Sequence, residues 1–239
     1  MRREPYGVGS IIHVVKRGAR GLAFLKEASD YDQLLLMLAH FNDKPARPFW
    51  YRELQDEGKL TSFERADTWG EKDPLVLIHA FCLHANHFHL LLEEIREDGV
   101  SLFMQKIGNG MSGYLNEKYK EFGSPFQGSY KSKTVNDDIY LRYVIAYIQT
   151  KNIFEQFPDG YAKATNHFAE AYAWSLKSPF SSSFDHLGRS DLPKRGIVSD
   201  LLVPTLWTPK QYRKFAVDVI LGRAHLGTTD ANAFRGAFL

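Results

Sequence analysis

The sequence has little of three things: cysteine, long apolar runs and net charge. Cys82 is the only cysteine in 239 residues, which excludes an intramolecular disulfide and a cysteine-based metal site and favours a reducing, cytoplasmic setting. The longest apolar stretch, 75–83, is far too short to span a bilayer. Arg2 and Arg3 have no apolar stretch behind them, so no signal peptide is expected. We therefore expect a cytoplasmic protein without a membrane partner.

The charge is nearly balanced, with 30 Lys and Arg against 28 Asp and Glu, a formal net charge of +2. Together with a hydrophobic content of 44%, this excludes a disordered chain and argues against a protein that coats nucleic acid through bulk charge. It does not exclude a nucleic-acid enzyme, because basic residues gather locally within 1–20 and at Lys131 and Lys133.

Hydrophobic periodicity predicts an α+β protein. The expected elements are a hairpin of strands 11–15 and 22–25, a helix to residue 41 capped by Asp30, a strand pair 75–84 and 87–93, a helix 101–119, an exposed strand 126–135 and a helix from 137 to 151. The glycines at 108, 110 and 113 each cost the expected helix 101–119 roughly 1 kcal/mol of stability against alanine. We interpret residues 44–74 as a long connecting segment, an excursion from the fold, with some helix near 52–57.

The pattern of the sequence changes after residue 158. Helical patterns at 161–176 and 209–221 flank a loop rich in Ser and Pro. We predict a domain 1–158 followed by a mostly helical appendage, 159–239.

The strongest chemical feature is His87-Phe88-His89 on a predicted strand. Side chains at i and i+2 project from the same face of a strand roughly 7 Å apart, so two imidazoles can converge on one metal ion while Phe88 turns into the core. A pair of hydrogen-bonded histidines on a sheet face explains the motif equally well, since a single His-x-His arises often by chance.

A second feature is the row of tyrosines Tyr140, Tyr143 and Tyr147 on one predicted helix. A tyrosine hydroxyl with a pKa near 10 is a poor nucleophile unless a metal or base activates it, but its attack on a phosphodiester would conserve the bond in a phosphotyrosine. Aromatic packing at helical spacing is the alternative, and spacing does not choose among the three tyrosines.

Two basic segments are candidate DNA contacts. The segment 126–133 interleaves aromatic, amide and basic side chains that suit base stacking and phosphate pairing, although a solvated edge strand would look the same. The flexible turn at 16–21 is the other. The predicted DNA-binding side chains are Lys16, Arg17, Arg20, Gln127, Tyr130, Lys131 and Lys133.

In their order, these segments resemble the REP-associated tyrosine transposases, of the HUH superfamily of single-strand transposases and nucleases. The likeness covers roughly residues 6–155. It runs through Ile12-His13-Val14, Asn86-His87-Phe88-His89-Leu90, Phe103-Met104-Gln105-Lys106, Tyr114-Leu115-Asn116, Phe126-Gln127-Gly128-Ser129-Tyr130-Lys131 and Tyr147-Ile148. A weaker likeness reaches Trp174-Ser175 and Tyr212-Arg213.

The resemblance implies an antiparallel ferredoxin-like sheet with helices on one face. It also implies that His87 and His89 bind a divalent metal, Mg or Mn, and that Tyr147 is the nucleophile, with Tyr143 as the fallback. One departure concerns the third ligand, because the family usually has an amide at the fourth residue after the tyrosine and this chain has Lys151 there. Asn152 is our choice for that ligand, with Gln149 as the alternative.

The implied function is a metal-dependent endonuclease and transposase that cleaves and rejoins single-stranded DNA near hairpins through a 5′-phosphotyrosine. The expected partner is hairpin-bearing single-stranded DNA, and the protein is a monomer or homodimer. One alternative is a regulator that binds DNA or RNA without cleaving it. Another, a His-x-His metallohydrolase of small molecules, lacks further ligands in sheet positions.

Overall fold

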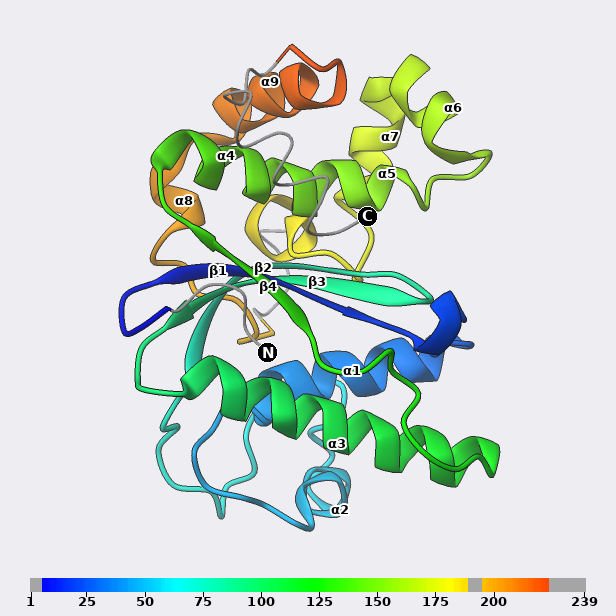
Figure 1. Ribbon diagram of the computed structural model, residues 1–239, viewed down its shortest axis with the longest axis vertical. Helices are drawn as coiled ribbons and strands as arrows, with labels where there is room; N and C mark the ends of the chain where they lie inside the picture. The colour runs from blue at the N-terminus through cyan, green and yellow to red at the C-terminus, as the bar shows by residue number, and fades with distance from the viewer. Residues whose placement is uncertain (1–5, 189–194, 224–239) are drawn as a thin grey trace.

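Four antiparallel strands form the centre of the molecule, in the order β2–β3–β1–β4 (Figure 1). The computed structural model describes residues 6–188 and 195–223. The strands are β1 (Ile11–Arg17), β2 (Val76–Leu83), β3 (His87–Glu94) and β4 (Lys131–Val135). This order follows from two strand–helix–strand units wound side by side, and it confirms the α+β antiparallel, ferredoxin-like class.

The central strand β1 is apolar on both faces because each face is covered by helices. Ile12 and Val14 belong to one hydrophobic core, and Val15 belongs to the other. His13 therefore points, with Val15, to the second face, since side chains alternate along a strand. Helices cover both faces of the sheet and not the single face that was expected (Figure 1), so a site built on either face is partly shielded from water.

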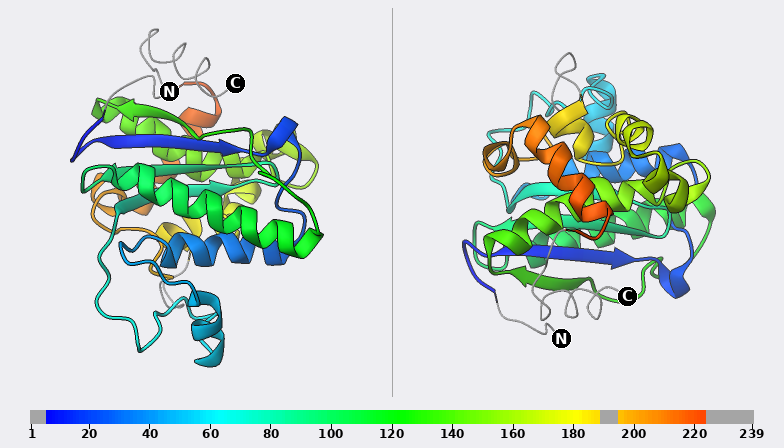
Figure 2. Two further views of the ribbon diagram at one scale, coloured as in Figure 1. Left: turned by 60° about the horizontal axis from the view of Figure 1, so that its bottom comes forward. Right: turned by 90° about the horizontal axis from the view of Figure 1, so that it is seen from above.

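The first layer of helices contains α1 (Ala28–His40) and α3 (Gly99–Tyr119), which run side by side beneath the sheet (Figures 1 and 2). Their close approach explains one glycine of α3. A Cβ on Gly110 would lie 2.4 Å from the ring of Phe41. The excursion between α1 and β2 carries the short helix α2 (Trp50–Asp56), where some helix was expected, and packs Trp69 against Leu54.

The second layer lies on the opposite face and begins with α4 (Asp138–Ala146) (Figure 1). It continues through the π-turn η2 (Tyr147–Lys151), α5 (Asn152–Phe154), α6 (Gly160–Asn166), α7 (Phe168–Ser175), η3 (Phe184–Gly188), α8 (Val203–Leu206) and α9 (Pro209–Ile220). Helix α9 was expected at this place. Ile148 and Tyr212 lie in one core, so the appendage packs directly onto the helix that follows β4. The domain boundary near residue 158 stays a prediction.

The expected hairpin of 11–15 with 22–25 is wrong. After Arg17 the chain makes the 3-10 turn η1 (Ala19–Gly21), and residues 22–25 form no strand. The amides of Phe24 and Leu25 donate to the carbonyl of Ala85 instead. Both edges of β1 are occupied by β3 and β4, which are distant in sequence, so the local pattern could not show these pairings.

Three expected boundaries also differ. The strand 126–135 is a strand only over Lys131–Val135, because Phe126 turns into the first core. Asp30 is the third residue of α1 rather than its cap. It completes a capping box with Glu27, whose side chain accepts the third amide. The helix to Lys151 is α-helical only as far as Ala146. Within residues 6–188 and 195–223, no helix is long and apolar enough to cross a membrane.

His40 at the end of α1 predicts an acid-sensitive fold. Its side chain is buried against the rings of Trp50 and Trp69, and burial, followed by the charges of Lys72 and Arg65, lowers its pKa to about 4. The unfolded chain therefore binds a proton between about pH 6.5 and 4 that the native protein excludes, and stability falls as the pH falls through that window. Between pH 7 and pH 4, the free energy of unfolding should fall by about 1–3 kcal/mol less in His40→Phe than in wild type. Urea unfolding at pH 7, 5.5 and 4 checks this, and parallel losses in the two proteins would contradict it.

Candidate active site

The two histidines of the His-x-His motif lie on the face of β3 that α4 and the π-turn cover. Phe88, between them, is fully buried in the opposite core, as strand alternation requires. The ring centroids of His87 and His89 are 5.0 Å apart. The motif therefore presents two imidazoles side by side.

Hydrogen bonds to one nitrogen of each ring fix their orientations. The Asn86 amide nitrogen donates to Gly21 O, so its oxygen faces His87 and accepts from Nδ1 at 2.7 Å. His87 Nε2 is then the nitrogen with a lone pair. His89 Nδ1 is bonded to Nε2 of His13 at 2.9 Å, which leaves Nε2 of His89 for a ligand. Such hydrogen bonds behind a ligating histidine are typical of metal sites.

All four histidines of the region are neutral at pH 7. Burial lowers the pKa of His13 to about 3 and that of His84 to about 3, and it lowers the pKa of His87 to about 4. Burial also lowers the pKa of His89 well below its ordinary value, with further contributions from the neighbouring histidines. Neutral imidazoles keep a lone pair for a metal ion, so the site is ready to bind a cation without first losing protons.

Tyr147 is carried to these histidines by the π-turn that follows α4. Its ring meets the ring of His89 edge-on at 5.7 Å between centroids and that of His13 at 6.2 Å. The ring of Tyr143 stacks on the ring of Tyr147, with 6.2 Å between the two ring centroids. Of the three tyrosines considered in the sequence, Tyr140 is buried in the second core and its ring is covered by the ammonium of Lys133.

The surroundings of Tyr147 keep its hydroxyl protonated in the free protein. Burial, followed by the charge of Glu155, raises its pKa, whereas Arg17 acts in the opposite direction. The ammonium of Lys151 lies over the ring, 5.1 Å from its centroid. A phenol in this state attacks only when a cation or base at the site favours the phenolate.

The π-turn changes which residue returns beneath Tyr147. The backbone amide of Asn152 donates to the carbonyl of Tyr147, an i→i+5 bond that holds one residue more than an α-helical turn. Asn152 is 1% exposed and its Nδ2 has no hydrogen-bond partner within the described residues. The amide at i+5 thus takes the place relative to Tyr147 that an i+4 amide takes in a regular helix.

Gln149, the alternative ligand, and Lys151, at the position where the amide was expected, are both held by contacts near the turn. Gln149 donates through Nε2 to Ser182 Oγ at 3.0 Å and to His186 Nδ1 at 2.7 Å, both in the appendage. Lys151 covers the Tyr147 ring. Gln149 Oε1 itself has no hydrogen-bond partner within the described residues, so Gln149 stays the alternative to Asn152 for the third ligand.

The predicted DNA contacts divide between the two faces of the sheet. Arg17 shares the face of the histidines, and its charge lowers the pKa of both His87 and His89. Lys131 is exposed on the edge strand, but the ammonium of Lys133 is buried over Tyr140. Lys16 and Tyr130 face α3 instead, where Tyr130 bonds Tyr6 and Ser101 through its hydroxyl. Arg20 lies in the turn η1 and Gln127 in the loop before β4, and both are exposed.

Sequence reasoning gave no role to three residues of the site, His13, His84 and Glu155. His84 stacks on His87 at 4.3 Å between centroids and contacts Cys82 Sγ at 3.7 Å. A polar residue at the centre of an apolar strand is the signal that His13 offers, but only the register of β1 against β3 shows that it meets His89.

The donor set fits a divalent cation that substrate helps to hold. Within the described parts of the chain, no three His, Cys, Asp or Glu side chains are placed to hold a metal ion. His87, His89 and the Asn152 amide would supply two nitrogens and one oxygen, leaving positions for phosphate and water oxygens. Mixed imidazole and oxygen donors suit Mn, and Mg prefers the oxygens.

Residues 67–151 match the model of a protein family described as IS200-like transposases. The matched segment includes His87, His89 and Tyr147 and ends one residue before Asn152. No curated protein matches the chain. Among solved structures, the chain is similar to a REP-associated tyrosine transposase bound to a REP hairpin, with 15% identity and a TM-score of 0.46 over 84% of this chain and 94% of that chain. The family match confirms the likeness to transposases that the motifs indicated.

Proposed function

We infer, from the match of residues 67–151 to the IS200-like transposases, that the protein cleaves and rejoins single-stranded DNA beside a hairpin, with Tyr147 as nucleophile. The observation that carries this proposal is the position of Tyr147 against His89 and His13 on a π-turn that Asn152 directly follows. Such turns are rare and occur frequently at functional sites.

The proposed step begins with the scissile phosphate lying over His87 and His89, and Arg17 would bind a neighbouring phosphate of the same strand. The Tyr147 hydroxyl oxygen attacks phosphorus, a Tyr–O–P bond forms and the P–O3′ bond breaks. The phenolic proton is lost and the departing oxygen gains one, so the products are a 5′-phosphotyrosine and a free 3′-hydroxyl. A divalent cation held by His87, His89 and Asn152 would supply charge stabilisation at the phosphate.

The reverse step rejoins the DNA. A 3′-hydroxyl from another end takes the position of the leaving group and attacks the phosphotyrosine, which restores the phenol. Because the phosphotyrosine keeps the energy of the broken ester, no nucleotide cofactor is needed. His13 would act through His89 by holding that ring in one orientation.

The test is a search for the covalent intermediate. The wild-type protein is incubated with single strands from the DNA that flanks its gene, with and without Mn, and denatured with detergent. We expect a Mn-dependent protein–DNA adduct whose tryptic peptide carries the nucleotide on Tyr147. An adduct on another residue would overturn the assignment of Tyr147. Tight binding with no adduct under any metal would favour the alternative of a non-cleaving DNA- or RNA-binding regulator.

A further inference from the structure

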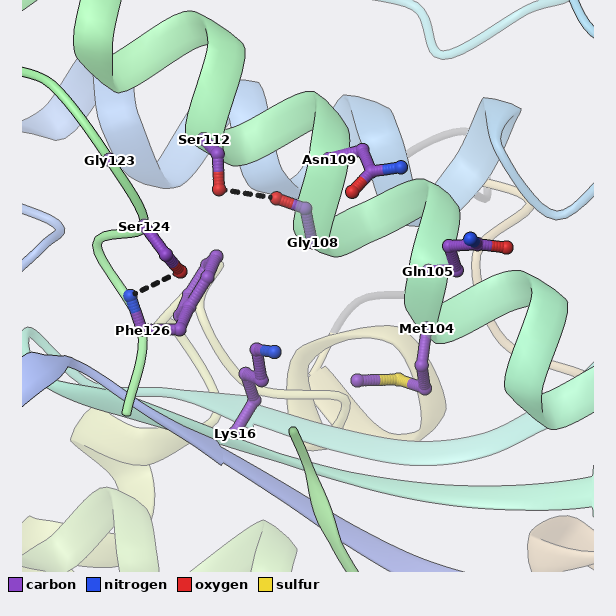
Figure 3. A pocket seen from close by; sticks show the side chains of 9 residues that line it. All are labelled: Lys16, Met104, Gln105, Gly108, Asn109, Ser112, Gly123, Ser124 and Phe126. Atoms are coloured by element: carbon purple, nitrogen blue, oxygen red, sulfur yellow. Dashed lines mark hydrogen bonds between the residues drawn. The ribbon is translucent and has the colours of Figure 1, made fainter. Parts of the chain in front are cut away.

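A polar pocket of about 310 Å³ lies between α3 and the end of β1, on the face of the sheet away from Tyr147 (Figure 3). It adjoins a second hollow of about 560 Å³, with which it shares Lys16, Met104 and Gln105. Lys16 rises from the sheet between Phe126 and Met104 towards Gly108 of α3 (Figure 3). The proposed cleavage mechanism uses none of these residues.

The lining groups are those that recognise a nucleobase. Gln105 and Asn109 are exposed amides one turn apart on α3, and each offers both a donor and an acceptor. Met104, which belongs to the first core and is 2% exposed, closes the apolar side of the pocket. The ammonium of Lys16, half-buried over the Phe126 ring and bonded to Gly128 O at 2.9 Å, adds one positive charge.

Gly108 at the floor of the pocket has no packing reason to be glycine. Gly110 makes room for Phe41, as described above, but a Cβ on Gly108 would touch only Lys16 Nζ, at an ordinary 3.8 Å. Glycine inside a helix costs stability, and here the cost leaves the floor of the pocket open. Gly113 has open space as well and lies outside the pocket, so what distinguishes Gly108 is its position in the pocket lining.

Consecutive basic residues of β1 lie on the pocket face and on the catalytic face of the sheet. Lys16 and Arg17 are consecutive on β1 and point to opposite faces, Lys16 to the pocket and Arg17 to the histidines. Strand β4 begins at Lys131, opposite Val15, so the last two residues of β1 lie beyond its end and are flanked by the loop at 126–128. Two basic side chains therefore lie at the same end of the sheet, one on each face.

We propose that this pocket takes one unpaired base of the DNA strand that Tyr147 cleaves, and that it contributes to the choice of target sequence. The inference rests on the proposed function, because it assigns the pocket to the same strand. Phosphate alone is a poorer match, since one lysine and two amides provide little charge but several directed hydrogen bonds.

Two leucine substitutions on α3 test the proposal. Gly108→Leu fills the pocket floor, whereas Gly113→Leu, where a Cβ meets nothing within 4 Å, places the same side chain on the helix outside the pocket. Leucine favours helix over glycine, so both variants should melt at or above the wild-type temperature. For fluorescein-labelled single strands from the gene-flanking DNA, the Kd of Gly108→Leu should rise roughly 5-fold or more and that of Gly113→Leu should stay within about 2-fold.

An abasic scan of the same strand identifies the base. One abasic position should weaken wild-type binding by the same factor as Gly108→Leu and should have no further effect in that variant. Unchanged binding by both variants, equal weakening by both, or additive abasic effects would overturn the pocket assignment. If wild-type protein forms no Tyr147 adduct but the leucine variants and the abasic position change binding as expected, only the cleavage proposal is refuted. Wild-type protein that binds none of the strands would refute both proposals.

Discussion

Replacing Tyr147 by Phe is expected to abolish the covalent protein–DNA adduct and reduce strand cleavage by roughly a thousand-fold or more, with hairpin binding near that of wild type. The substitution removes only the attacking oxygen. The ring contacts with His89 and His13, and the cation of Lys151 over the ring, persist in phenylalanine. Binding and stability should therefore survive while chemistry is lost. Detergent gels of Mn-containing reactions and anisotropy with labelled hairpin DNA measure the two properties.

Tyr143→Phe is the matched control for this experiment. Tyr143 lies one helical turn earlier and stacks on Tyr147, so the same loss of one hydroxyl occurs 6.2 Å from the proposed nucleophile, measured between ring centroids. We expect Tyr143→Phe to form the adduct within a few-fold of wild type. Adduct at wild-type yield in Tyr147→Phe, together with its loss in Tyr143→Phe, would move the nucleophile to Tyr143.

The strand pair that carries the metal candidates could be predicted because its signal is local. An apolar run, a two-residue connection and a second apolar run specify an antiparallel pair with no need of distant contacts, and β2 and β3 lie within one residue of their predicted positions. The same alternation put His87 and His89 on one face. Short-range periodicity was therefore sufficient for half of the site.

The other half depends on pairings between segments far apart in sequence. His13 reaches His89 only through the register of β1 against β3, in which Val15 lies opposite His89. No local pattern encodes that register, and the expectation that β1 pairs with residues 22–25 would have placed His13 against the wrong neighbours. The failed hairpin and the unassigned histidine thus have one cause.

The π-turn was beyond local prediction for a different reason. The apolar spacing of Tyr140, Val144 and Ile148 continues a 3.6-residue period up to the turn, so the sequence reads as one helix. The extra residue is accommodated by tertiary contacts. Gln149 is held by Ser182 and His186, and Thr150 bonds the Tyr212 hydroxyl at 3.0 Å. The appendage, which sequence analysis left without a role, therefore contacts the turn that carries Tyr147.

Because of the π-turn, we expect deletion of Lys151 to impair Mn-dependent adduct formation less than the substitution Asn152→Ala. Deletion of Lys151 shortens the Tyr147–Asn152 segment by one residue, which allows an ordinary α-helical turn with the amide at the fourth position after Tyr147. Asn152→Ala keeps the turn but removes the proposed oxygen ligand. We expect the deletion to need a Mn concentration within about 10-fold of wild type for half-maximal adduct, and Asn152→Ala to need about 100-fold more, as for loss of a metal contact.

The comparison separates a role in metal binding from a role in helix structure. If Asn152 served only to pack the buried turn, its replacement by the smaller Ala would lower the melting temperature and leave the Mn requirement unchanged. Lys151→Met is the control for the lost cation over Tyr147, since it keeps both chain length and the side-chain stem. A Mn requirement raised as much by the deletion as by Asn152→Ala, with Lys151→Met unaffected, would show that the five-residue spacing itself is needed. The amide would then not be interchangeable with one at the fourth position.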